Sequence, residues 1–108
     1  MIACSEGLAF GEKLGMDPKK LQEILSTTTA SCFSMKQGNP VPGNIPNSPA
    51  SNNYEGGFSV GKLRKDVSLA LECADRNDQN LKFTEKSINY YRQLEKKGHS
   101  KKDFSIVY

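Results

Sequence analysis

The stretch that decides the fold runs from Val60 to Asp75 and reads VGKLRKDVSLALECAD. Its apolar residues recur with the 3.6-residue spacing of an amphipathic helix, so we predict a helix with a core-facing stripe made of Val60, Leu63, Val67, Ala70, Leu71 and Ala74. Lys62, Lys65 and Leu69 fall on the opposite face of this helix. A leucine on a lysine-bearing face indicates either contact with a partner domain or a single exposed apolar side chain.

Helix signals also precede this stretch. Residues 1–15 read as a helix that is already under way at its first residue, with small residues four apart at Ala3, Gly7 and Gly11 where a second helix could approach. Asp17 and Pro18 form an N-cap and first-turn pair that predicts a second helix. A short third helix is expected around 32–38.

Further helix signals follow the 60–75 stretch. A long helix is expected over about 82–97, with a broad apolar face made of Phe83, Ile88, Tyr90, Tyr91 and Leu94. Residues 101–108 predict a last short helix that docks back on the domain. Between the two groups of helices, residues 39–57 hold four of the five prolines, and we expect an ordered loop that wraps over the surface.

Composition limits the possible functions. At 108 residues the chain has the size of one domain, and we interpret residues 1–108 as a single all-α unit. No apolar run approaches the roughly 20 residues that span a bilayer, so we expect no membrane insertion. The net charge of +3 comes with no basic face interleaved with aromatic residues, which argues against nucleic-acid binding.

Sites with their own chemistry are also not indicated. Cys4, Cys32 and Cys73 show no metal-ligand spacing, so we expect no metal and interpret each cysteine as a small apolar residue on a helix. No GxGxxG fingerprint is present, which excludes a nucleotide-binding strand–helix unit of that type within the chain. These observations favour a helical domain that is part of something larger.

Several segments together resemble the 3-hydroxyisobutyrate dehydrogenase branch of the β-hydroxyacid dehydrogenase family. The strings are MIACSEG at 1–7, LGMDPK at 14–19, NPVPG at 39–43, NNYEGGF at 52–58, LRKD at 63–66 and KKDFS at 101–105. They occur in order over almost the whole chain, and the NPVPG loop favours this branch over the glyoxylate, succinic-semialdehyde and tartronate-semialdehyde reductases of the family. The resemblance implies an all-α fold, namely a compact helical C-terminal domain (6-phosphogluconate dehydrogenase C-terminal-like) for substrate binding and dimerisation.

The resemblance also implies how the chemistry is divided. NAD would be bound mainly by an N-terminal Rossmann domain outside this chain, and the catalytic lysine of the family would lie upstream of Met1, so no catalytic residue is expected among the 108 residues. The partners would be that NAD-binding domain, further copies in a dimer or tetramer, and a small hydroxy acid. The location would be mitochondrial, and the isolated chain would be inactive.

Three residues are assigned to the site by the resemblance. Lys65 would bind the nicotinamide end of the cofactor, or else be an ordinary solvated helix lysine. Asp66 would line the substrate pocket, or else pair with a nearby lysine on the helix flank. Phe58 would form a wall of the substrate pocket, or else be a core residue, and the glycines at 56 and 57 would allow the bend that brings it to the site.

One departure affects the pocket. Where the family often has Gly-Arg-Cys-Trp, this chain has Ala30-Ser31-Cys32-Phe33, which lacks the arginine and replaces the tryptophan ring with a smaller one.

From the resemblance as a whole, we expect a dehydrogenase that oxidises 3-hydroxyisobutyrate to methylmalonate semialdehyde with NAD in valine breakdown. The alternatives are a glyoxylate or semialdehyde reductase, and a non-catalytic module that self-associates through the stripe of small residues and the Tyr90/Tyr91 helix.

Overall fold

Five α-helices and two short 3-10 helices make up the structure, a computed structural model that describes all residues 1–108. They are α1 (Ile2–Lys13), α2 (Pro18–Leu25), α3 (Phe33–Lys36), η1 (Pro49–Asn52), α4 (Val60–Asp75), α5 (Lys82–Lys96) and η2 (Phe104–Val107). The only strand-like pairing is one isolated antiparallel bridge between Ser59 and Asp103. None of the helices combines the length and the apolar character that crossing a bilayer requires.

The helix starts follow from local chemistry. Asp17 caps α2 by accepting a hydrogen bond from the Lys20 backbone N–H at 2.9 Å, and Pro18 occupies the first turn, as predicted. Ser59 caps α4 in the same way, through the backbone N–H of Lys62. The predicted bounds of α4 are therefore confirmed.

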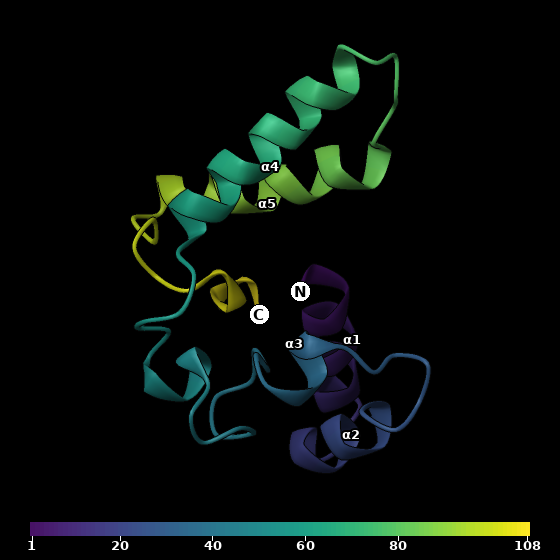
Figure 1. Cartoon of the computed structure of the whole chain (residues 1–108). Helices are drawn as coiled ribbons and strands as arrows, with labels where there is room; N and C mark the ends of the chain where they lie inside the picture. Colours follow the sequence, from purple (N-terminus) through teal and green to yellow (C-terminus); the bar gives the residue numbers. More distant parts are fainter.

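The elements form two parts (Figure 1). The helices α4 and α5 pack against each other as an antiparallel hairpin that projects from one end of the molecule, and we call residues 60–96 the hairpin. The remaining residues, which include α1, α2, α3 and both 3-10 helices, form the body. The centre of the body is a small apolar cluster of Leu8, Met35 and Val41, against which Leu21 and Tyr108 pack.

The projecting hairpin makes the molecule less compact than expected. The radius of gyration is 14.6 Å, whereas a compact domain of this length has about 13 Å. Because no third layer covers the hairpin, the predicted core stripe of α4 is mostly half-buried: only Val60 is fully buried and Ala70 is exposed. The expectation of a compact domain is therefore wrong for the hairpin.

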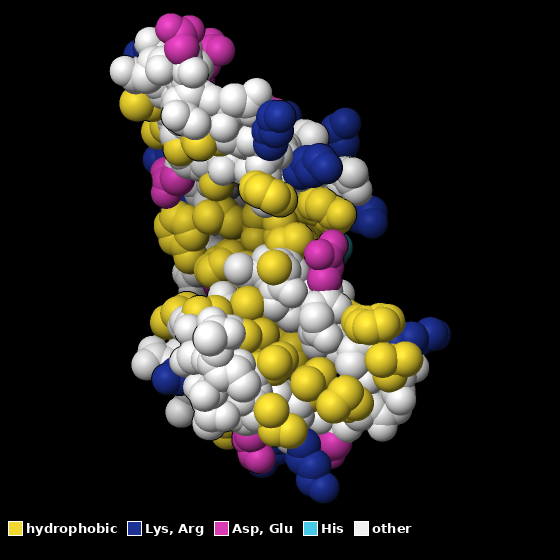
Figure 2. Space-filling view, turned by 90° about the vertical axis from the view of Figure 1, so that its right-hand side faces the viewer, with side chains coloured by type: hydrophobic (Ala, Val, Ile, Leu, Met, Phe, Trp, Pro, Cys, Tyr) yellow, Lys and Arg dark blue, Asp and Glu magenta, His cyan; other side chains and the backbone are white.

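The predicted apolar face of α5 divides into two sets. Ile88 and Tyr91 are buried, whereas Phe83 is 88% exposed and Tyr90 is also exposed. Leu69 on α4 is exposed as well. Figure 2 shows apolar side chains gathered across the waist of the molecule, between the hairpin and the body.

The small-residue stripe of α1 is partly used inside the chain. A Cβ at Gly11 would clash with the side chain of Leu21, so this glycine allows α2 to approach α1 closely. A Cβ added at Gly7 would meet no other side chain or segment within 4 Å. Because Leu21 covers Gly11 and Tyr91 is buried, fewer residues of the stripe of small residues and of the Tyr90/Tyr91 helix are available for self-association than the sequence pattern indicated.

Candidate functional site

A cavity of about 310 Å³ lies beside Phe58, where the loop before α4 meets the C-terminal segment and α3. This volume is at the lower end of the range for small-molecule sites. Phe58 and Phe104 meet edge to face, with ring centroids 6.5 Å apart, and form one apolar wall. The lining residues are Phe33, Gln37, Gly38, Asn47, Pro49, Gly57, Phe58, Asp103 and Phe104.

The backbone bend that presents Phe58 depends on the two glycines before it. Gly56 and Gly57 have φ angles of +77° and +62°, in the left-handed region that side chains disfavour. At Gly57 the space is also limited, since a Cβ there would collide with the Asp103 carboxylate and with Pro49 Cγ. The prediction that these glycines make the bend is consistent with this geometry.

Asp103 fastens the bend from the C-terminal segment. Its side chain is only 3% exposed, and its Oδ2 accepts a hydrogen bond from the Phe58 backbone N–H at 2.7 Å. Its Oδ1 accepts a second one from the Ser105 backbone N–H at 2.9 Å, which caps η2. One buried carboxylate therefore sets the position of both Phe58 and the helix that carries Phe104.

Backbone hydrogen bonds reinforce this junction. The Phe104 N–H donates to the Phe58 carbonyl at 2.9 Å, and the Asp103 N–H donates to the Tyr54 carbonyl at 2.8 Å. Lys102 Nζ adds bonds to the Asn53 carbonyl at 2.8 Å and to Glu55 at 2.6 Å. Lys102 therefore ties the C-terminal segment to the loop before α4.

Lys65 and Asp66 lie in the second turn of α4. The Lys65 Nζ is 3.3 Å from the Asp66 Oδ1, and their side chains are 66% and 52% exposed. Neither residue lines the cavity beside Phe58. The structure thus brings Phe58 into a cavity and places Lys65 and Asp66 together on an exposed helix face outside that cavity.

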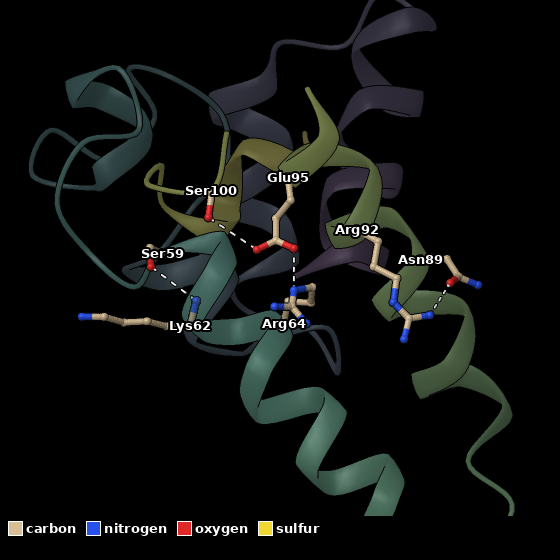
Figure 3. A network of polar contacts seen from close by, with 7 residues as sticks. All are labelled: Ser59, Lys62, Arg64, Asn89, Arg92, Glu95 and Ser100. Carbon is tan, nitrogen blue, oxygen red and sulfur yellow. Dashed lines mark hydrogen bonds and ion pairs between the residues drawn. The ribbon is translucent and has the colours of Figure 1, made fainter. Parts of the chain in front are cut away.

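Arg64, the neighbour of Lys65 in the sequence, points toward Glu95 on α5 (Figure 3). Its Nε is 2.5 Å from the Glu95 Oε2, and the other Glu95 oxygen accepts a hydrogen bond from the Ser100 hydroxyl at 3.4 Å. This network joins α4, α5 and the turn after α5 at the base of the hairpin. Glu95 therefore neutralises Arg64, whereas Lys62 on the same helix is exposed and forms no ion pair.

A second hollow of about 560 Å³ lies at the far end of the hairpin, between the end of α4 and the start of α5. Carboxylates dominate its polar side chains, namely Glu72, Asp75, Asp78 and Glu85, with Arg92 at one side. Arg92 also donates a hydrogen bond to Asn89 at 3.1 Å. No motif in the sequence indicates a role for these residues.

Sequence reasoning missed Asp103 as a site residue, although it lies in the KKDFS segment on which the resemblance rested. A capping signal was available, since Asp103 precedes the short apolar segment Phe104–Val107 in the manner of an N-cap. What the sequence could not show is that its second oxygen reaches Phe58, a residue 45 positions earlier. The role of Phe33 in lining the cavity was likewise not assigned.

The chain matches a known family over residues 1–108, and the family is described as NAD-binding of NADP-dependent 3-hydroxyisobutyrate dehydrogenase. A Dictyostelium discoideum relative named probable 3-hydroxyisobutyrate dehydrogenase, mitochondrial, is 44% identical over the whole chain, which covers 34% of that relative. The Homo sapiens 3-hydroxyisobutyrate dehydrogenase, mitochondrial, is 39% identical, with 32% of its length covered. The chain therefore spans about a third of the length of these relatives.

A solved structure shows the same fold. The Mycobacterium tuberculosis 3-hydroxyisobutyrate dehydrogenase, in a structure with L-serine, superposes with a TM-score of 0.92 and 30% sequence identity. The match covers 98% of this chain and 36% of that one.

These findings correct two expectations. The chain is helical and has no sheet, but the matching family is described as NAD-binding, so its assignment as the C-terminal domain is wrong. The idea that NAD binding is left mainly to a domain absent from this chain conflicts with the same finding. The missing GxGxxG motif excluded one mode of nucleotide binding, whereas a helix face that carries a lysine can contact a nucleotide without a glycine-rich phosphate loop.

The resemblance to 3-hydroxyisobutyrate dehydrogenases is confirmed by the family match, by the relatives and by the solved structure. The match to the family extends over every residue of the chain. We conclude that the chain belongs to the family described as NAD-binding of NADP-dependent 3-hydroxyisobutyrate dehydrogenase.

Proposed function

We propose that the chain is the part of an NAD-dependent dehydrogenase that holds the nicotinamide end of the cofactor next to a small 3-hydroxy acid. The reaction is the oxidation of 3-hydroxyisobutyrate to methylmalonate semialdehyde, and the setting is mitochondrial valine breakdown. NAD supplies the hydride acceptor. The observation that carries the proposal is the bend at 56–58, which is fixed by Asp103 and presents Phe58 to a cavity directly before the helix of Lys65 and Asp66.

The residues present fit such a cofactor. Lys65 is exposed, and its only ion pair is the one with Asp66, which at that exposure is worth at most about 1 kcal/mol. A ligand with polar oxygen or amide groups can therefore replace this pair at little cost. Phe58 is 39% exposed, so part of its ring is free to pack against a flat heterocycle.

The size of the cavity and one relative support a small 3-hydroxy acid as the substrate class. The cavity of about 310 Å³ suits a small molecule, and its walls combine apolar rings with the side-chain amides of Gln37 and Asn47 and the carboxylate of Asp103. The Mycobacterium tuberculosis relative was solved with L-serine. L-Serine is itself a carboxylic acid with a hydroxyl on its third carbon, as 3-hydroxyisobutyrate is.

Each residue of the site has a separate role in this proposal. Lys65 contacts the nicotinamide end of the cofactor and Phe58 is a wall of the substrate pocket. Asp66 lies on the helix beside Lys65, outside the cavity of Phe58, and orients this neighbouring group through their ion pair. No residue of this chain is assigned as the acid or base for the substrate hydroxyl. We therefore expect no turnover by the chain alone, and we propose that the dehydrogenase works as a dimer or tetramer.

The cofactor role is tested by Lys65→Ala in the complete dehydrogenase, with Lys62→Ala as the matched control on the same helix. Loss of one charge-assisted contact worth about 1.4 kcal/mol would raise the Kd for NAD about tenfold. Lys62→Ala should leave it within about twofold, since a solvated lysine contributes little. Equal NAD affinity in the Lys65→Ala variant and the unaltered enzyme would refute the cofactor role.

The substrate role is tested by Phe58→Ala, with Phe83→Ala as the control because Phe83 is exposed far from the cavity. We expect Phe58→Ala to lower kcat/KM for 3-hydroxyisobutyrate by tenfold or more, and Phe83→Ala to leave it unchanged. The rates with 3-hydroxyisobutyrate and with glyoxylate are compared in the unaltered enzyme. A preference for glyoxylate reduction would contradict the proposed substrate.

A further inference from the structure

Two cysteine thiols from distant parts of the chain face each other in the body. Cys4 lies on α1, Cys32 is the N-cap residue of α3, and their Sγ atoms are 3.7 Å apart. A disulfide needs about 2.05 Å, so the sulfurs must approach by about 1.7 Å. All three cysteines are free, and Cys73 lies exposed on α4, in the hairpin. The pair therefore needs only a small movement to become bonded.

The environments of the two thiols differ, and this difference indicates which thiol reacts first with an oxidant. Although burial opposes it, the backbone N–H groups of Met35 and Ser34 and the Cys4 thiol hold the pKa of Cys32 below its ordinary value. Burial first, and then the Cys32 sulfur, raise the pKa of Cys4. Cys32 is exposed and Cys4 is half-buried. Because the thiolate is the reactive form, Cys32 is the thiol that an oxidant meets first.

We propose that Cys4 and Cys32 form a reversible redox pair, which a hydroperoxide converts to an intramolecular disulfide. The Cys32 thiolate attacks one peroxide oxygen, the O–O bond breaks, and Cys32 becomes a sulfenic acid while hydroxide leaves. The Cys4 thiol then attacks the Cys32 sulfur, the S–S bond forms and water leaves. In total, two thiols lose two electrons and two protons, and hydrogen peroxide is reduced to two molecules of water.

The disulfide would act on the cavity through the next residue. Phe33 follows Cys32 directly, its ring packs on Gly38, and both residues line the cavity beside Phe58. Movement of the Cys32 sulfur toward α1 shifts the start of α3, and the Phe33 ring moves with it. The effect on catalysis rests on the proposed function, whereas formation of the disulfide does not.

The bond would also tie α1 to α3 across the turns of 26–32. Closing a loop between residues 4 and 32 restricts the unfolded chain, so the oxidised form should unfold at a higher temperature than the reduced form. Reduction with dithiothreitol should return the melting temperature to its original value.

The test uses the purified chain with Cys73→Ser, which removes the third thiol from the measurement. After treatment with hydrogen peroxide and alkylation of free thiols, the protein is digested with trypsin without reductant and studied by mass spectrometry. We expect peptides 1–13 and 21–36 to appear as one linked species that separates on reduction. In a Cys4→Ser, Cys73→Ser variant no link should form, and dimedone should label Cys32 as the sulfenic acid.

Two results would overturn the proposal. One is oxidation of Cys32 to sulfinic acid while Cys4 stays open to alkylation, and the other is a link that forms only between two copies, seen as a dimer on a non-reducing gel. Neither result bears on the Lys65 and Phe58 assays. Conversely, failure of those assays would leave the linked peptides unchanged, so the two proposals fail independently.

Discussion

Replacing Asp103 by asparagine tests whether one buried carboxylate holds the C-terminal segment against the bend at Phe58. In the native chain both oxygens accept backbone N–H donors, at 2.7 Å from Phe58 and 2.9 Å from Ser105. Asparagine keeps one acceptor oxygen but turns an NH₂ group toward one of these N–H donors, so a hydrogen bond to a charged group is lost. Such a bond contributes about 1.5–3 kcal/mol, and we expect the free energy of unfolding to fall by that amount.

The measurement is urea unfolding followed by circular dichroism, with the free energy extrapolated linearly to water. Asp75→Asn is the matched control, because Asp75 is exposed on α4 and its side chain forms no ion pair or hydrogen bond in the structure. We expect the control to change stability by less than about 0.5 kcal/mol. If Asp103→Asn and Asp75→Asn cost the same, the bend is held by its backbone hydrogen bonds and our reading of the carboxylate is wrong.

Two further predictions concern α1 and the C-terminus. Gly7→Ala should stabilise the chain by roughly 0.5–1 kcal/mol, because alanine has a higher helix propensity and its methyl group meets no neighbour there. Gly11→Ala should destabilise the chain by about 1–3 kcal/mol, because its methyl group meets Leu21. Equal melting temperatures for the two variants would contradict the packing of α1 on α2. Burial and the hydrogen bond to Glu12 raise the pKa of Tyr108 to about 12. Its neutral form is therefore favoured in the folded state, and the stability linked to it is present below about pH 10 and lost as the pH rises toward 12. Tyr108→Phe should reduce the fall of the melting temperature as the pH rises over that interval. An unchanged fall would show that the ionisation of Tyr108 is not its cause.

Local signals in the sequence were enough to predict the helices. The Asp17–Pro18 pair and the periodic stretch from Val60 to Asp75 each carry their own start and stop chemistry within a few residues, so their bounds could be found without any tertiary contact. The docking of the last short helix on the rest of the chain was also predicted, because its aromatic and aliphatic residues need cover.

Burial was predicted less well, since it depends on what packs behind each helix. Spacing alone placed Phe83 and Tyr90 on the same apolar face as Ile88, but α4 covers only part of that face and nothing else in the chain covers the remainder. The cysteines show the same difficulty: Cys32 is an exposed cap residue instead of a small apolar residue on a helix.

The candidate site could be predicted only in part, for a similar reason. Phe58 was found from the motif around it, and the glycines explain why it leaves the loop in the direction of the cavity. Asp103 could not be assigned to it, because its partner lies 45 positions away and no local pattern indicates which segment a buried carboxylate will meet.

The hairpin has a consequence for how the molecule opens in solution. It is joined to the body at its base by hydrogen bonds from the Val60 and Gly61 N–H groups to carbonyls of the segment after α5, while residues 75–80 at its far tip are exposed. Amide protons at that tip should exchange with deuterium through fraying that leaves the body intact, whereas those around Leu8 and Met35 should wait for global unfolding. We therefore expect two units that differ in their protection from hydrogen exchange, and the hairpin, which carries Lys65, is the less protected one.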